Sequence, residues 1–220
     1  MNSPVEIEFA VNLAPWNGGP RQFGILQLRP LVPDREASDL RLDDVRDEDL
    51  VCRSPKVLGN GRLDRIRDVV FIDVDAFDRS KSRDVAQEVA RLNAHLTADG
   101  VPYLLFGVGR WGSRDPWLGI PVTWGQISGA RAIVEAGFKD LRVEPSQGSH
   151  FFQNLTSFQV GYFTVNDAVG EGFVDWRWLL AQPTVSRRGS TRHVRLDEPL
   201  VVKMNGRTHQ GVIYKPGRGG

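Results

Sequence analysis

The sequence predicts an α/β protein of mixed α+β type, built on a mixed sheet with at least one parallel strand–helix–strand unit. Two apolar stretches of strand character, 69–75 and 101–106, flank a segment whose apolar residues recur at helical spacing. Short alternating segments near both ends of the chain predict a β-hairpin and a β meander. We therefore expect three parts: residues 1–33, a linker over 34–66, and an α/β domain over 67–220.

Composition limits the kinds of partner that the protein can have. The 220 residues carry a formal net charge of +1 and a single cysteine. A neutral total gives no overall field toward nucleic acid, and one cysteine excludes an internal disulfide framework. No apolar run reaches the roughly 20 residues of a membrane helix. We expect no DNA, RNA or membrane partner, and a cytoplasmic location.

The first thirty residues predict two paired strands. Residues 5–10 alternate apolar and charged side chains, residues 15–20 are rich in proline and glycine, and residues 22–31 read as a second strand. A hairpin follows from this order.

The hairpin carries polar side chains that share faces. Because side chains repeat every second residue on a strand, Glu6 shares one face with Glu8, and Gln27 shares one with Arg29. If the strands pair, an acid, an amide and a guanidinium can converge there. The alternative is a solvated face, which the spacing alone favours.

The two segments Glu6-Ile7-Glu8-Phe9-Ala10 and Leu26-Gln27-Leu28-Arg29-Pro30 resemble the end of a known domain. It is the nucleotide-binding domain of phosphoenolpyruvate synthase and pyruvate phosphate dikinase, which is similar to ATP-grasp folds. In that family an Ile-Glu-aromatic segment is followed by a strand reading Gln-x-Arg-Pro.

The resemblance implies a role for three residues in an ATP–Mg²⁺ site. Glu8 would help to hold the magnesium ion, a hard cation that suits a carboxylate. Gln27 and Arg29 would line the phosphate-transfer site, with Arg29 as a catalytic residue, since a guanidinium suits phosphoryl oxygens. Residues 1–33 would then be the end of an ATP-grasp-like domain.

The rest of that family's machinery has no counterpart here. No segment resembles the glycine-rich phosphate loop, the phosphohistidine domain or the pyruvate-binding barrel. Segments 107–121 and 146–154 look like the C-terminal extension of some bacterial proteins of the pyruvate phosphate dikinase, PEP/pyruvate-binding type. The resemblance therefore implies a C-terminal module that is inactive alone and needs an upstream ATP-grasp domain.

The strand at 69–75 ends in carboxylates. Asp73 and Asp75 lie on one face, and Asp78 follows. Such a pair can bind a metal or accept protons. The alternative, which we favour, is that Asp75 or Asp78 caps or precedes the next helix.

The helix expected from Ser80 or Ser82 to Ala98 completes the central unit. Its apolar stripe is followed by Gly100, and the next strand is 101–106. Strands joined in this way are parallel, so residues 73–78 and 107–115 should meet at the carboxyl edge of the sheet, where ligands bind.

The loop that begins at Gly107 matches the G-x-G-x-x-G spacing, but Pro116 and Pro121 oppose the helix that a dinucleotide site needs. We expect instead a polar site on an irregular loop, with Arg110, Ser113 and Asp115 binding a small phosphorylated ligand. The alternative is a glycine-rich connection packed under two tryptophans.

A second polar concentration lies at 146–154. Gln147 and His150 are candidate ligand contacts, and His150 is a candidate acid, base or phosphate contact. A buried structural histidine is the equal alternative.

The remaining chain predicts strands at 130–136 and 160–165, a short helix at 173–182, and a meander of strands, 192–196, 200–204 and 211–214. The basic run from Arg187 to Arg195 can contact phosphates, although a solvated strand face is favoured.

Two other functions stay open. One is a non-catalytic module that binds a small anion, a nucleotide or another domain. The other is an independent metal-dependent enzyme that uses Asp73, Asp75, Asp115, Glu135 and His150.

Overall fold

The chain forms two compact units, residues 1–36 and residues 37–220, in a computed structural model. The structure describes residues 5–14, 18–30, 45–138, 141–144, 154–155 and 158–219. None of the described helices is long and apolar enough to cross a membrane.

The first unit contains the expected hairpin. Strands β1 (Val5–Asn12) and β2 (Gln22–Pro30) pair antiparallel, with a bulge between Glu8 and Phe9. The prediction of a paired N-terminal hairpin is therefore confirmed.

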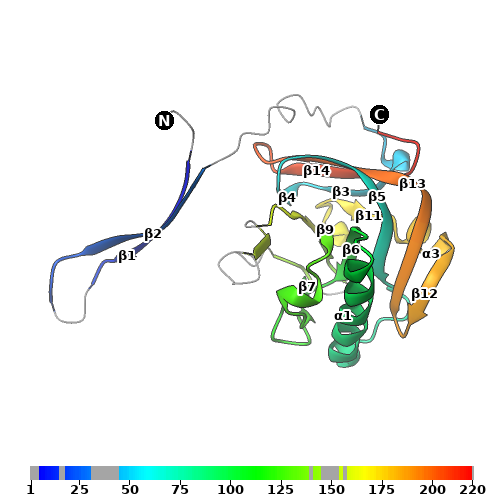
Figure 1. The fold of residues 1–220 in the computed structure, drawn as a ribbon, viewed down its shortest axis with the longest axis horizontal. Helices are drawn as coiled ribbons and strands as arrows, with labels where there is room; N and C mark the ends of the chain where they lie inside the picture. The colour runs from blue at the N-terminus through cyan, green and yellow to red at the C-terminus, as the bar shows by residue number, and fades with distance from the viewer. Residues whose placement is uncertain are drawn as a thin grey trace. The chain divides into compact units, whose positions relative to one another are not determined.

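The second unit is built on one mixed sheet, and the predicted fold class is confirmed (Figure 1). Within the described residues this sheet has 10 strands, in the order β11-β3-β14-β13-β5-β6-β9-β10-β4, with β12 paired to β13. The strands are β3 (Leu50–Ser54), β4 (Lys56–Leu58), β5 (Gly61–Ile72), β6 (Tyr103–Val108), β9 (Ala130–Ala136), β10 (Gly161–Val165), β11 (Phe173–Val174), β12 (Thr184–Arg188), β13 (Thr191–Asn205) and β14 (Gln210–Tyr214).

Four neighbouring strands, β5, β6, β9 and β10, are parallel, and the other pairings are antiparallel. Helix α1 (Ser82–Ala98) connects β5 to β6, as expected, and Gly100 follows it at φ +66°. The shorter elements are η2 (Asp47–Asp49), η3 (Arg79–Lys81), β7 (Arg110–Trp111), β8 (Gly119–Ile120), η4 (Trp124–Gln126), η5 (Asp167–Val169) and α3 (Trp176–Ala181).

The sheet closes on itself through β3 and β4. Only Pro55 separates these strands, yet β3 pairs with β14 and β4 pairs with β10 on the far side of the sheet. The Ser54 hydroxyl donates to the Thr164 carbonyl oxygen at 2.6 Å across this junction. The sheet therefore has an enclosed face and an outer face.

Each face carries its own hydrophobic core. The enclosed face gathers apolar residues from β3 to β14, with Phe71, Phe106 and Phe163 fully buried, and α3 packs against it. The outer face packs Val70 and Ile72 against α1. Burial on both faces explains the continuous apolar sequence of β6.

Residues 45–66, expected as part of a linker, contribute η2, β3, β4 and half of β5 to the second unit. Leu50, Val51 and Cys52 are completely buried. This apolar run is short and is flanked by charged residues and proline, which hide its strand character.

The C-terminal meander also differs in detail. The two strands expected at 192–196 and 200–204 are one strand, β13, whose register to β5 shifts between Arg195 and Leu200. The irregularity accommodates Pro199, which cannot donate a hydrogen bond to the ladder.

Candidate functional site

The hairpin register brings together two of the three residues to which the resemblance gives a role, Glu8 and Gln27. Glu8 is the Cα partner of Gln27, and Glu6 is the Cα partner of Arg29. Direct cross-strand partners project to the same face of a two-stranded sheet, and the Glu8 and Gln27 side chains are exposed there. A carboxylate and an amide thus lie on one polar face, with the Arg29 backbone two residues beyond Gln27.

The opposite face of the hairpin is apolar and exposed. Ile7, Phe9 and Val11 alternate along β1, and their neighbours on β2 include Phe23 and Ile25. The Phe9 and Phe23 rings touch, with centroids 5.2 Å apart, yet both side chains are more than half exposed. This face has the composition of a strand surface that packs on other protein.

The loop after β6 is irregular, as expected. No helix follows Gly107; instead β7 pairs with β8 in a small parallel sheet. The Ser113 hydroxyl donates to the Asp115 carbonyl, and an Asp115 carboxylate oxygen accepts the Trp117 backbone N–H, both at 2.9 Å. Ser113 and Asp115 therefore stabilise the turn of their own loop.

Arg110 lies near enough to the buried carboxyl of Glu135 for its charge to act on that group. One Glu135 oxygen accepts the Trp111 backbone N–H at 2.8 Å, and the other accepts the Tyr162 hydroxyl at 2.5 Å. Burial raises the pKa of Glu135 to about 7, against the lowering effects of these hydrogen bonds and of the Arg110 charge. The charge of Arg110 thus acts on both Glu135 and Tyr162, which are hydrogen-bonded to each other.

The other sequence-derived candidates are placed as follows. Gln147 and His150 lie outside the described residues. Asp73 is buried: one of its oxygens accepts the backbone N–H groups of Asp75 and Ala76, and the other binds Arg192 and Arg187. Asp78 caps η3, as favoured from the sequence, through the Ser80 backbone N–H.

The basic run of β12 and β13 is divided between two buried aspartates. Arg187 and Arg192 bind Asp73, whereas His193 and Arg195 bind Asp68. The sequence shows the basic run, but its acidic partners lie more than 100 residues away along the chain. No pattern in the neighbouring sequence could therefore predict which aspartate each of these basic residues binds.

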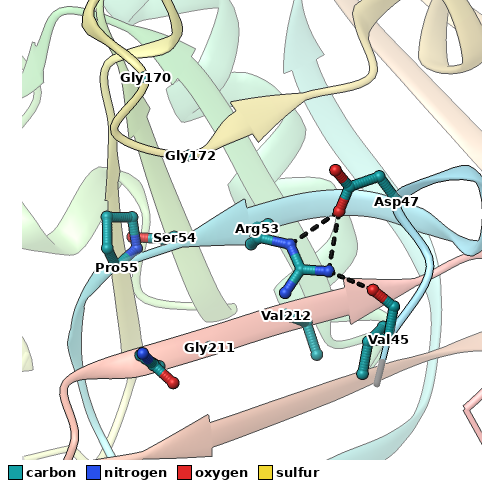
Figure 2. Close-up of a pocket in the computed structure, with 10 residues that line it drawn as sticks. Val45, Asp47, Arg53, Ser54, Pro55, Gly170, Gly172, Gly211 and Val212 are labelled. Carbon is teal, nitrogen blue, oxygen red and sulfur yellow. Dashed lines mark hydrogen bonds and ion pairs between the residues drawn. The ribbon is translucent and has the colours of Figure 1, made fainter. Parts of the chain in front are cut away.

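A pocket of about 550 Å³ lies between β3, β14 and the loop before β11 (Figure 2). Arg53 lines this pocket, and its guanidinium group binds the Asp47 carboxylate and the Val45 carbonyl oxygen. Gly172, at φ +81°, passes so close to β3 that a Cβ would lie 2.2 Å from the Arg53 carbonyl oxygen. The charge of Arg53 is balanced, so this pocket suits a neutral polar molecule better than an anion.

No group of three or more His, Cys, Asp or Glu side chains is placed to hold a metal ion among the described residues. Glu8 on the hairpin is an exposed carboxylate that fits a magnesium ion whose other ligands come from phosphate oxygens and water.

Comparisons with protein-family models, with curated proteins and with solved structures find no match to this chain.

Proposed function

We propose that the chain is the C-terminal module of an ATP-dependent phosphotransferase similar to phosphoenolpyruvate synthase and pyruvate phosphate dikinase. The polar face of its hairpin contributes Glu8, Gln27 and Arg29 to an ATP–Mg²⁺ site that an ATP-grasp-like domain completes. The proposal places the protein in the cytoplasm, where ATP is supplied. The module alone does not transfer phosphate.

The hairpin register is the observation that supports this proposal most. It sets Glu8 opposite Gln27 and Glu6 opposite Arg29, so the motif residues come from paired positions. The chemistry of each type matches its role: the carboxylate of Glu8 for magnesium, and the guanidinium of Arg29 for the transferred phosphoryl group. In phosphoryl transfer such groups act by positioning and by stabilising charge.

The apolar face of the same hairpin supports the need for another domain. A two-stranded hairpin is at best marginally stable in water, and three or more strands with a covered hydrophobic face are needed for independent stability. Phe9, Phe23 and Ile25 are 56%, 63% and 61% exposed. An ATP-grasp-like domain that supplies further strands would bury this face and hold the polar face toward its nucleotide.

The test is made on the natural polypeptide that contains these 220 residues. ATP consumption in the presence of pyruvate is measured for the native protein and for Arg29→Lys and Gln27→Ala. We expect kcat to fall roughly 100-fold or more in Arg29→Lys, because a charge-stabilising donor is lost. Arg21→Ala, an exposed arginine of the same unit, is the matched control and should retain native kcat.

Two results would contradict the proposal. One is native turnover in Arg29→Lys. The other is a natural polypeptide that neither binds nor consumes ATP with Mg²⁺ present.

A further inference from the structure

A recess of about 300 Å³ opens on the second unit, beside the start of β6. Its residues are far along the chain from Glu8, Gln27 and Arg29 of the proposed ATP site. A ligand bound in the recess would therefore not depend on that site. Arginines dominate its lining, which consists of Arg65, Arg67, Asp68, Gly100, Val101, Pro102 and Arg195.

The buried carboxylate of Asp68 holds Arg195 in place, and His193 binds that carboxylate. The Arg195 Nε group donates to both oxygens of Asp68, at 2.9 and 3.1 Å. Asp68 also contacts His193 Nε2 at 2.7 Å, and both side chains are about nineteen-twentieths buried. The two terminal nitrogens of Arg195 have no partner among the described residues, so they are free for a ligand.

Arg65 and Arg67 add two charges to the same recess. They lie two residues apart on β5, which places them on one face of the strand. Both are exposed, and neither forms an ion pair or hydrogen bond within the described part of the chain. Charged side chains left unpaired around a recess are available to an incoming group of opposite charge.

We propose that this recess binds the phosphate group of a small phosphorylated molecule. Three arginines and one aspartate line the recess, so its described lining carries an excess of two positive charges, and guanidinium forks match phosphate oxygens in geometry. The half-charge of the α1 C-terminus, which ends just before Gly100, opposes binding but is much smaller. The recess volume admits a phosphate group and little more than a small attached moiety.

Asp68 and His193 act as positioning residues in this arrangement. Asp68 binds the Nε group of Arg195 and so orients its guanidinium group, and His193 holds the Asp68 carboxylate in position. The pocket near Arg53 differs, because there Asp47 neutralises the arginine and the described lining contains no further arginine. The two cavities therefore have different ligand preferences.

Calorimetric titration of the full 220-residue chain with inorganic phosphate and with pyrophosphate tests the proposal. We expect saturable binding of one pyrophosphate per chain, weakened roughly tenfold or more in Arg67→Ala and in Arg195→Ala by loss of a charge-assisted hydrogen bond. Arg188→Ala removes an exposed arginine of β12 that does not line the recess, and should bind as the native chain does.

Arg195→Lys separates positioning from charge, because lysine keeps the charge and lacks the Nε contact to Asp68. We expect it to bind several-fold more weakly than the native chain. Native affinity in Arg67→Ala and Arg195→Ala, or equal losses in Arg188→Ala, would overturn the site. Native affinity in Arg195→Lys would overturn the positioning by Asp68. Tighter binding of single-stranded RNA than of pyrophosphate, with the same arginine dependence, would assign the recess to nucleic acid and overturn the proposal.

Discussion

Glu135 shows how burial changes the chemistry of one carboxyl group. It is 1% exposed, and its pKa is raised from 4.5 to about 7 chiefly because burial penalises the charged form. Its hydrogen bonds from Trp111 and Tyr162 lower the cost of ionisation but do not cancel it. The group is therefore half-ionised near neutral pH.

This shift predicts a dependence of stability on pH. Between pH 4.5 and 7 the folded chain holds the Glu135 proton while the unfolded chain has lost it, so stability falls as pH rises. The contribution is up to about 1.4 kcal/mol per pH unit. Urea unfolding at a series of pH values should show this slope in the native chain and a flatter one in Glu135→Gln.

Glu198→Gln is the control for that experiment, because Glu198 is an exposed carboxyl of β13. It should keep the native slope. An unchanged slope in Glu135→Gln would mean that Glu135 titrates in the folded protein as it does in the unfolded chain.

The β7–β8 pair depends on glycine where two backbones meet. A Cβ on Gly119 would lie 1.9 Å from the Arg110 carbonyl oxygen, far too close for two heavy atoms that are not bonded to each other. Gly119→Ala must therefore separate β7 from β8. We expect a loss of about 1–3 kcal/mol in the free energy of unfolding.

Gly125, in η4, provides the matched comparison, because a Cβ there meets nothing within 4 Å. Gly125→Ala should be as stable as the native chain in denaturant unfolding. Equal stability of Gly119→Ala and Gly125→Ala would show that the two strands are not held at this separation.

Elements with a strong local pattern could be predicted from the sequence, and elements defined by distant partners could not. The β5–α1–β6 unit has long apolar runs and a helical stripe, so its parallel arrangement followed from the pattern. β3 has only three apolar residues between charged neighbours and is a strand because β14 and β11 pair with it.

The same distinction applies to the candidate sites. The Glu8–Gln27 pairing could be anticipated because two strands joined by a turn have few registers. The Asp68–His193–Arg195 cluster could not, because it joins residues about 125 positions apart. Nor does spacing reveal that Ser113 and Asp115 bind within their own turn.

The fold of the second unit depends on the closure of its sheet at Ser54. Its hydroxyl donates to Thr164 of β10 and accepts the Lys56 backbone N–H at 3.1 Å, so it joins three strands. Ser54→Ala leaves both backbone groups without this partner in a buried place. We expect thermal and urea unfolding to show a loss of about 1–3 kcal/mol.

Ser128→Ala is the control for Ser54, since the Ser128 hydroxyl makes one long bond of 3.4 Å near the surface. It should unfold like the native chain. A Ser54→Ala variant as stable as Ser128→Ala would indicate that β3 and β4 close the sheet without the hydroxyl.

Amide hydrogen exchange connects the two units to the proposed function. In β6 every residue is buried, and β6 is paired on both sides, so its amides should exchange most slowly. The β1–β2 hairpin has only two strands and an exposed apolar face, so its amides should exchange quickly in this chain. If the natural polypeptide contains the proposed ATP-grasp-like domain, that domain should slow exchange in β1 and β2 and leave β6 unchanged. Slow hairpin exchange in the 220-residue chain that disappears on dilution would instead assign the apolar face to a second copy.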